Sequence, residues 1–441
     1  MEHYTKAVPM LLPRQGIDLT RWAVVACDQY TSQPEYWNQL EEQVGQNPST
    51  LRLILPEVWL EEPDAHQRMQ AVWDTMEAYQ RQGLLLPTPP GMMLVQRQME
   101  GMNQPRTGLV MAFDLEAYDY REGAEGAIRP TEKTVEERIP QRLAVRKKAS
   151  LELPHILLLV DDPEDTVIQP LVEMTTQLQQ VYDVPLLAGG GRVTGWFVPE
   201  GPLTQQVQQA LVQLAQPERF ASRYGISEDM SPVLFATGDG NHSMAAAKAS
   251  WEEIRKELTP EERQQHPARW VLAELVNLNQ QSLEIEPIHR LLFGASLQQV
   301  QQQAQAFFKK HGAQVEFWEQ PTQPDGWTIP LVAGQQRCWM QLKQSPWALP
   351  IGAIQAFLDD YLAQQPKLRL DYIHGEDTLC SLAAEPDCVG FILPDLEKRQ
   401  IFEGVIKDGV LPRKTFSMGR AQDKRYYLEA RRIQPQPHHK L

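Results

Sequence analysis

Short apolar runs alternate with amphipathic helical patterns along the whole chain, and this alternation limits the fold more than any other feature. Runs such as "TGLVMAFD", "HILLLV" and "SPVLFAT" have the length and the aliphatic content of buried strands. Between them lie patterns typical of helices, among them "TQQVQQALVQLAQ" and "SMAAAKASWEEIRKEL". Strands interspersed with helices predict a mixed α/β (α+β) fold with mixed sheets.

The length of 441 residues favours more than one domain. The composition shifts at about residue 295, where the Gln-rich helical pattern "SLQQVQQQAQAFFKKHG" begins. No linker rich in Pro, Gly or Ser separates the two halves, so we expect lobes in contact. The predicted domains are an N-terminal lobe, 1–294, and a C-terminal α/β lobe, 295–441, that closes over the functional site.

Three further segments give definite expectations of secondary structure. "WAVVAC" predicts a strand, followed by a polar loop and a helix. "DTVIQPLVEMTTQLQQVY" predicts one amphipathic helix, and "RYYLEARRI" predicts a strand that ends the C-terminal lobe.

Charge and composition narrow the class of protein. The net charge of −15 argues against a nucleic-acid partner, because backbone phosphates are bound mainly by clustered Lys and Arg. The four cysteines form no CxxC pair and predict reduced thiols. No signal peptide or run long enough to span a bilayer is apparent. We therefore expect a cytoplasmic protein that acts on a small molecule, with no membrane partner and with homo-oligomerisation left open.

The stretch "FATGDGNHSMAAAKAS" places polar residues between an apolar run and a helical pattern. Amides at a helix N-terminus favour a phosphate or carboxylate, and glycine lets the backbone approach a ligand closely. Asp239 suits Mg²⁺ binding or proton transfer, and His242 suits contact with a phosphate or proton shuttling. A tight turn with a capping Asp and a packed His explains the same pattern equally well. The residues concerned are Gly238, Asp239, Gly240, Asn241, His242 and Ser243.

Other segments carry groups suited to catalysis or anion binding. "RPTEKT" contains Glu132, "EPIHRLL" contains His289 and Arg290, and "LPRKTF" contains Arg413 and Lys414. Each is also consistent with a structural role, as a structural pair or an exposed basic loop. Arg138, Arg142 and Arg146 recur at helical spacing, which indicates either a phosphate grip or, more commonly, a solvated face with Glu partners.

Taken together, these segments resemble the domain of unknown function 1015 family. That family has an Asp-Gly-His-His-Arg signature between a strand and a helix, with Pro-His-Glu-x-Thr before it and Pro-Thr-His-Arg and Pro-x-Lys-(Ser/Thr) after it. The four segments occur here in the same order over nearly the whole chain. Asn241 and Ser243 replace a His and the Arg of the signature, and Thr131 replaces the His before Glu132. "ACDQYTSQPEYW" stands where the family has Pro-Pro-Tyr-Asp, and Asp28 keeps the acid.

The family is more distantly similar to the ParB/sulfiredoxin fold, which includes free-serine kinases with Asp-Gly-x-His-Arg loops. The resemblance implies nucleotide-dependent phosphoryl transfer, with ATP or ADP and Mg²⁺, to a small hydroxylated metabolite such as serine. It implies that Asp239, His242 and Glu132 are catalytic, with Asp239 also holding the metal. The implied phosphate-binding residues are Gly238, Gly240, Asn241, Ser243, Arg413 and Lys414, and the implied substrate-binding residues are Asp28, His289 and Arg290. The alternative is a non-catalytic sensor of a small molecule or nucleotide, which the missing His and Arg favour.

Overall fold

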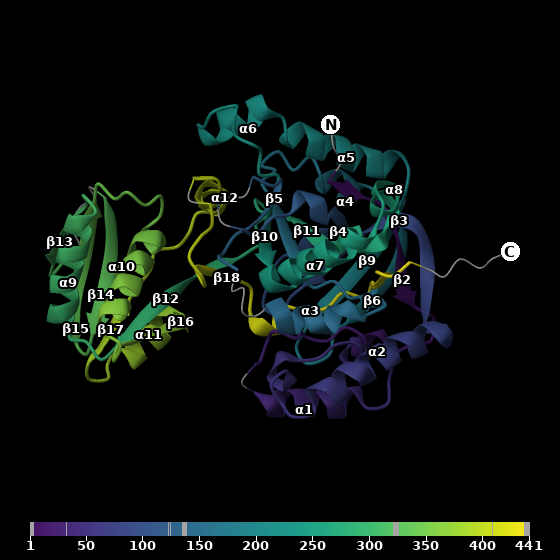
Figure 1. Cartoon of the computed structure of the whole chain (residues 1–441), viewed down its shortest axis with the longest axis horizontal. Coiled ribbons are helices and arrows are strands. Elements are labelled where there is room, and N and C mark those ends of the chain that lie inside the picture. Colours follow the sequence, from purple (N-terminus) through teal and green to yellow (C-terminus); the bar gives the residue numbers. More distant parts are fainter. Residues whose placement is uncertain are drawn as a thin grey trace. The chain divides into compact units, whose positions relative to one another are not determined.

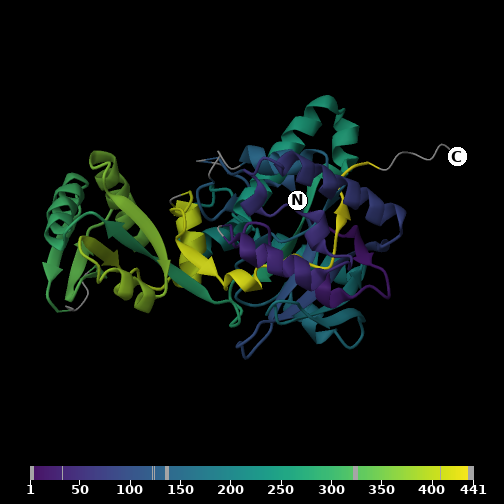
Figure 2. The same ribbon diagram turned by 90° about the horizontal axis from the view of Figure 1, so that it is seen from below.

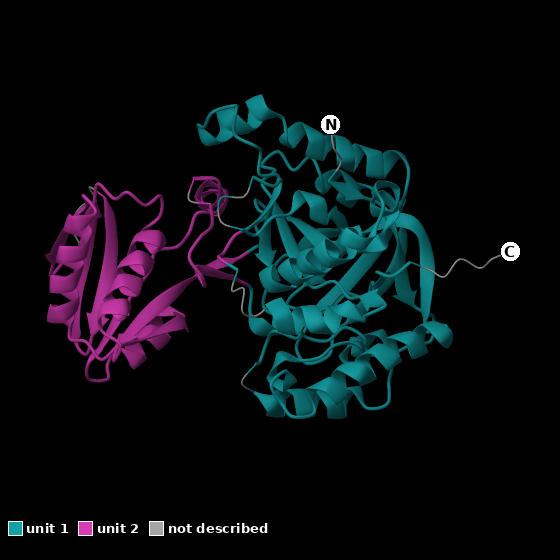
Figure 3. Ribbon diagram, in the orientation of Figure 1, with its two compact units in different colours: residues 1–130, 134–283, 419–441 teal, residues 131–133, 284–418 magenta. Residues whose placement is uncertain are grey.

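The computed structural model describes residues 4–31, 33–121, 123, 125–134, 139–320, 326–407 and 409–435. Chain contacts divide it into two compact units (Figure 3). Unit 1 comprises Met1–Pro130, Thr134–Leu283 and Gly419–Leu441, and unit 2 comprises Thr131–Lys133 and Glu284–Met418. Both units combine sheets with helices (Figure 1), so the predicted mixed α/β fold is confirmed.

Unit 1 is built on a ten-stranded mixed sheet. Its central path runs β5-β10-β7-β11-β4-β3-β9-β8, with β1 paired to β4 and β2 paired to β3. The strands are β1 (Thr5–Lys6), β2 (Val8–Pro13), β3 (Leu85–Gln98), β4 (Arg106–Asp114), β5 (Ile128–Pro130), β7 (Leu157–Val160), β8 (Gln179–Pro185), β9 (Arg192–Pro199), β10 (Phe235–Asp239) and β11 (Trp270–Asn277). Two short strands, β6 (Leu151–Glu152) and β19 (Arg431–Arg432), form a separate antiparallel pair.

Helices cover both faces of this sheet, because alternate residues of its central strands are apolar on either side. On β4, Leu109 and Phe113 pack with α7, whereas Val110 packs on the opposite face with α2. Figure 2, seen from below, places α1 and α2 nearest the viewer. The helices of unit 1 are α1 (Pro34–Val44), α2 (Ala65–Arg81), α3 (Ile139–Lys147), α4 (Gln169–Glu173), α5 (Pro202–Leu214), α6 (Pro217–Tyr224), α7 (Asn241–Ile254) and α8 (Pro260–Gln265).

Unit 2 contains a seven-stranded sheet of order β13-β15-β14-β17-β12-β16, with β18 paired to β12. Its strands are β12 (Ile285–Phe293), β13 (Gln314–Trp318), β14 (Trp327–Ala333), β15 (Gln336–Lys343), β16 (Arg369–His374), β17 (Cys388–Phe391) and β18 (Phe416–Met418). Its helices are α9 (Leu297–Lys310), α10 (Pro350–Gln364), α11 (Glu376–Leu382) and α12 (Lys398–Lys407).

The units differ from the predicted lobes at both ends of the second lobe. The change of unit falls at 283/284, before β12, and not at 294. The last segment, 419–441, belongs to unit 1, because Tyr427, Leu428 and Ala430 pack into its core. Apolar side chains near the C-terminus are therefore buried against strands from the beginning of the chain.

Three predicted elements are wrong. "WAVVAC" is buried but forms only an isolated bridge, between Val25 and Arg425, and not a strand. Residues 165–182 form the short helix α4 and the start of β8, because Gln179, Gln180 and the aromatic Tyr182 at their end pair with β9. The final "RYYLEARRI" contains only the two-residue strand β19 and isolated bridges. Among the described residues, no helix is both long and apolar enough to cross a membrane.

Candidate functional site

The "GDGNHS" segment forms the predicted junction between a strand and a helix. Strand β10 lies between β5, its parallel neighbour, and β7, its antiparallel neighbour. The register with β7 shifts between Thr237 and Asp239, so Gly238 lies at an irregularity of the ladder. Helix α7 begins at Asn241, and its buried alanines, Ala245, Ala246 and Ala247, allow it to pack closely on the unit 1 core.

Gly240 is required by the geometry of this turn. Its φ of +79° is left-handed, and a Cβ there would lie 3.1 Å from two atoms of Ile156. Because Gly240 is the N-cap of α7 and has no side chain, the cap supplies no side-chain hydrogen bond to the helix. The positive end of the α7 dipole at this turn favours an anion.

Asp239 is paired with a cation from the C-terminal segment. Its carboxylate lies 3.3 Å from Nζ of Lys424 and accepts a 2.9 Å hydrogen bond from the amide of Gly240. The carbonyl of Lys424 accepts a hydrogen bond from the amide of Ala26. This contact holds the chain that leads from Ala26 to Asp28 close to Lys424. Burial alone would raise the pKa of Asp28, but the neighbouring His155, a hydrogen bond from Gln29 and the charge of Lys424, among other contacts, hold it below its usual value. The charge of Lys424 thus acts on two predicted residues, as the ion-pair partner of Asp239 and through its effect on the pKa of Asp28.

Ser243 is hydrogen-bonded to a residue that the sequence did not suggest. Nε2 of His155 lies 2.9 Å from the Ser243 hydroxyl oxygen, and the imidazole packs edge-on against Tyr426 at 4.8 Å between ring centroids. Nδ1 of His155 is buried and has no hydrogen-bond partner among the described residues. Asn241, the other departure from the signature, accepts a hydrogen bond from the hydroxyl of Thr237. Both replacements are therefore engaged within unit 1.

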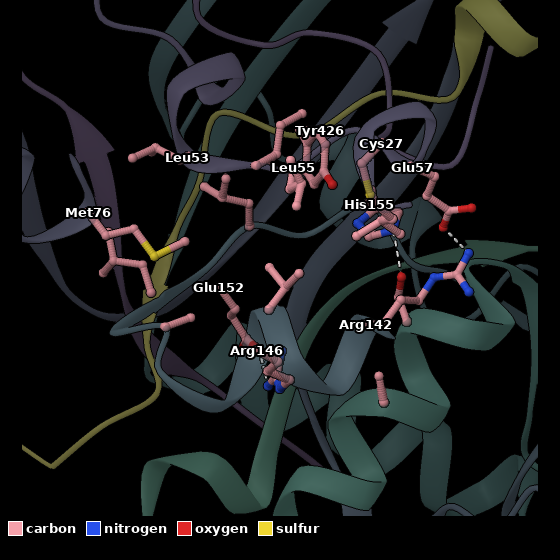
Figure 4. Close-up of a pocket in the computed structure, with 18 residues that line it drawn as sticks. Cys27, Leu53, Leu55, Glu57, Met76, Arg142, Arg146, Glu152, His155 and Tyr426 are labelled. Atoms are coloured by element: carbon pink, nitrogen blue, oxygen red, sulfur yellow. Dashed lines mark hydrogen bonds and ion pairs between the residues drawn. The ribbon is translucent and has the colours of Figure 1, made fainter. Parts of the chain in front are cut away.

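A cavity of about 130 Å³ begins at this histidine and is lined by residues of unit 1 (Figure 4). Arg142 and Arg146 from α3 line it, paired with Glu57 and Glu152 respectively. The predicted arginine stripe therefore has Glu partners at both of its described positions, while Arg138 lies outside the described residues.

Cys27 also lines the cavity, but its chemistry makes it a poor nucleophile. Burial, with the nearby charges of Asp28 and Glu57, raises the pKa of its thiol to about 12. A thiol that stays protonated is unreactive, because the thiolate is the nucleophile.

Glu132 lies in unit 2 and organises the "LPRKTF" loop. Its two carboxylate oxygens accept hydrogen bonds from the amides of Lys414 and Thr415, each 3.0 Å long. Leu411 pairs with Glu132 in a parallel bridge. Lys414 has a φ of +53°, which is uncommon outside glycine, so these contacts hold the loop in a restricted backbone conformation.

Arg290 and His289 are buried beside this loop. The guanidinium of Arg290 donates to the carbonyls of Arg413, Lys414 and Ile288 and to the side chain of Gln355. Burial lowers the pKa of Arg290 to about 10. Nδ1 of His289 accepts a 3.1 Å hydrogen bond from the amide of Leu393, and burial lowers the pKa of this histidine as well.

Arg413 and Lys414 are exposed and share one aromatic ring. Arg413 Nε donates a 2.8 Å hydrogen bond to the hydroxyl of Tyr372, and the Lys414 ammonium lies 5.4 Å from the centre of that ring. Arg290 lies over the same ring at 4.6 Å. Arg413 and Lys414 therefore form a basic surface beside Tyr372 in unit 2, and the buried Arg290 lies over the same ring.

The structure thus gathers the predicted residues into two groups. Unit 1 holds the residues of the strand-helix junction and Asp28, and unit 2 holds Glu132, His289, Arg290, Arg413 and Lys414. Sequence reasoning missed His155, Lys424 and Tyr426, which belong to the unit 1 group. Only His155 had a local signal, since it directly precedes the buried run "ILLLV".

The residues present fit a phosphate better than a metal held by the protein alone. No group of three or more His, Cys, Asp or Glu suited to a metal occurs in the described part of the chain. Mg²⁺ bound with a nucleotide commonly takes one or two carboxylates and completes its shell with phosphate oxygens and water. Asp239 could supply one such oxygen, and the first turn of α7 with Lys424 suits the phosphates.

The family described as "Protein of unknown function (DUF1015)" matches residues 11–362. The chain belongs to this family. The match covers the strand-helix junction, Glu132, Arg290 and His155, while the segment with Arg413, Lys414 and Lys424 lies beyond it. No curated protein matches this DUF1015 member significantly in sequence.

Several solved structures are distantly similar to this DUF1015 member. A free serine kinase in complex with AMP has 11% identity and a TM-score of 0.36, over 74% of this chain and 91% of that chain. SbnI from Staphylococcus aureus, truncated at its C-terminus, has 9% identity and a TM-score of 0.37, over 70% and 82%. A conserved hypothetical protein from Pyrococcus furiosus has 10% identity and a TM-score of 0.34, over 70% and 90%. Likeness at this level does not extend to ligands or chemistry.

Proposed function

We propose that this protein is a nucleotide-dependent phosphotransferase that acts on a small hydroxylated metabolite. The observation that carries the proposal is the junction at Gly240, where the glycine-capped N-terminus of α7 adjoins the Asp239–Lys424 pair. Phosphoryl transfer depends mainly on positioning and on neutralising charge, and helix amides with a lysine supply both.

The residues of unit 1 divide into two roles under this proposal. The amides from Asn241 to Ser243 and the ammonium of Lys424 bind the phosphates of ATP or ADP, while the amide of Gly240 stays bonded to Asp239. Asp239 orients the acceptor or supplies one oxygen to Mg²⁺, which when bound would neutralise phosphate charge. His242, half-buried in the first turn of α7, contacts the phosphates.

In unit 2, the predicted residues are assigned roles within the "LPRKTF" loop. Glu132 is the predicted general base, but both of its oxygens accept amide hydrogen bonds, and this arrangement favours a positioning role. Arg413 and Lys414 remain the predicted clamp for charged groups. Arg290 donates hydrogen bonds to the backbone carbonyls of both residues and so holds their loop in place. In this proposal it does not bind the substrate carboxylate.

Calorimetric titration of the full chain with AMP, ADP and ATP, with and without Mg²⁺, tests the proposal. We expect saturable binding, and Lys424→Met should weaken it about tenfold, the value of one charge-assisted contact. Lys256→Met, an exposed lysine just beyond the other end of α7, is the matched control and should leave binding unchanged. Absence of binding by all three nucleotides at millimolar concentration would overturn the proposal.

One observation favours a non-catalytic sensor. Asn241 is hydrogen-bonded to Thr237, and Ser243 is hydrogen-bonded to His155. The side chains at two signature positions thus bind other residues of the protein. A sensor would bind a nucleotide and release no phosphorylated product over hours of incubation, as followed by ³¹P NMR.

A further inference from the structure

The cavity beside His155 has a mostly apolar lining. Leu53, Leu55 and Met76 line it together with Val145 of α3. In Figure 4, Met76 and Leu53 lie on one side of the cavity and His155 on the other. Its volume is about 130 Å³, close to the cavity of about 150 Å³ that holds benzene in an apolar protein core. The space therefore fits an apolar body of about the size of one six-membered ring.

The charges around the cavity are already balanced. Its four charged residues form two pairs, Arg142 with Glu57 and Arg146 with Glu152, and all four side chains are mostly buried. A free amino acid carries an ammonium and a carboxylate, and each would need an opposite charge to offset its desolvation. Because the lining charges are taken up in pairs, the cavity disfavours a zwitterion such as serine.

Two residues that line the cavity each have a buried polar atom with no hydrogen-bond partner among the described residues: Nδ1 of His155 and Nε of Arg142. Buried polar atoms without a partner are costly, so a ligand oxygen that binds them gains free energy. In the tautomer in which Nε2–H of His155 donates to Ser243, Nδ1 can accept a proton from a hydroxyl. The hydroxyl of an alcohol can thus donate a hydrogen bond to Nδ1 of His155 at this end of the cavity.

We propose that this cavity binds the acceptor of the phosphoryl transfer, and that the acceptor is an uncharged alcohol with an apolar body of about one ring. This inference rests on the proposed function. The alcohol oxygen forms a bond to the terminal phosphorus of the nucleotide, while the bond from that phosphorus to its bridging oxygen breaks. The electron pair leaves with the shortened nucleotide, and the hydroxyl proton passes to Nδ1 of His155. Ser243, in the first turn of α7, links this histidine to the phosphate-binding helix end.

Benzyl alcohol and toluene form the test pair, because they share a ring and differ in the hydroxyl group. In NMR titrations of the full chain we expect benzyl alcohol to bind about fivefold more tightly than toluene, the value of one hydrogen bond. L-Serine should show no binding at the same concentrations. His155→Phe, which keeps a ring against Tyr426, should bring the ratio close to one. His66→Phe, at an exposed histidine on α2, is the control and should leave the ratio unchanged.

With ATP or ADP and Mg²⁺, ³¹P NMR should then show benzyl phosphate. Binding of L-serine in preference to benzyl alcohol would overturn the inference, as would a ratio that His155→Phe leaves intact. If nucleotides bind and serine alone is phosphorylated, the inference fails while the proposed function stands. If no nucleotide binds, the proposed function fails and the acceptor role fails with it.

Discussion

Asp239 holds two contacts at once, an ion pair with Lys424 and a hydrogen bond from the amide of Gly240. Asp239→Asn keeps an oxygen for the amide and removes the charge, so the turn should persist while phosphoryl transfer is lost. We expect turnover to fall at least about 100-fold, because the site loses the charged oxygen that orients the acceptor or holds Mg²⁺. The measurement is product formation by ³¹P NMR beside thermal unfolding.

Asp74→Asn, at an exposed position of α2, is the control for the loss of one negative charge. A large drop in melting temperature for Asp239→Asn, with activity retained by the folded fraction, would mean that Asp239 is a structural turn residue.

Lys6 is a second residue with unusual chemistry. Burial, followed by the charges of Arg431 and Arg269, lowers the pKa of its ammonium to about 8. It lies 4.1 Å from the ring centre of Trp270 and lines an open cavity of unit 1. At pH 8 about half of its amine is unprotonated, compared with under about 1% of an ordinary lysine.

Acetic anhydride at pH 8 should therefore acetylate Lys6 before the well-exposed Lys147. Peptide mass spectrometry measures the two rates of acetylation, and equal rates would contradict this prediction.

The turn between β10 and α7 depends on Gly240. Gly240→Ala must place a side chain at φ +79° and 3.1 Å from Ile156. We expect it to lower the free energy of unfolding by about 2 kcal/mol or more, since the left-handed backbone alone costs about 1–2 kcal/mol. Gly225→Ala, at φ +63° with no atom within 4 Å of the added Cβ, should lose the backbone contribution only. Urea denaturation of both variants measures the difference, and equal losses would show that the Ile156 contact is harmless.

Sequence patterns predicted this element well because the turn chemistry is local. "SPVLFATGDGNHSMAAAKAS" shows an apolar run, a glycine turn and an alanine-rich helix, and β10 and α7 follow it. "WAVVAC" failed because apolarity reports burial and not strand pairing. There the amide of Val24 donates to the Thr50 side chain, and the amide of Tyr426 donates to the carbonyl of Val24. These partners lie far away in the sequence, so no local pattern reveals them.

At the scale of the whole molecule, the C-terminal segment completes unit 1. Arg431 pairs with Glu152, and Lys424 and Tyr426 contribute to the candidate site. The order of the family segments allowed the motifs to be recognised, but it did not show that residues after 418 return to the first unit. Such a return depends on packing between segments that lie far apart in the sequence. This packing leaves no local pattern of apolar residues from which it could be predicted.

The same segment makes the stability of the protein depend on pH. Burial, with the nearby charge of Glu274, raises the pKa of Glu429 to about 7, although the Tyr182 hydroxyl donates a hydrogen bond to it. The folded state therefore keeps a proton that the unfolded state releases above about pH 4.5. The contribution of this group to stability is complete below pH 4.5 and is lost as the pH rises towards 7, a change of up to about 3 kcal/mol.

Glu429→Gln removes this titration and keeps an oxygen for Tyr182. Urea denaturation should show that the variant gains stability over the natural protein between pH 5 and pH 8, with the advantage growing as the pH rises. Glu228→Gln, at an exposed position, is the control and should follow the natural protein at every pH. A constant difference between Glu429→Gln and the natural protein across this range would mean that Glu429 stays ionised in the fold, with its charge offset by its neighbours. In that case an ionised Glu429 would add to the charge pairing by which Arg431 and Lys424 already hold the C-terminal segment in unit 1.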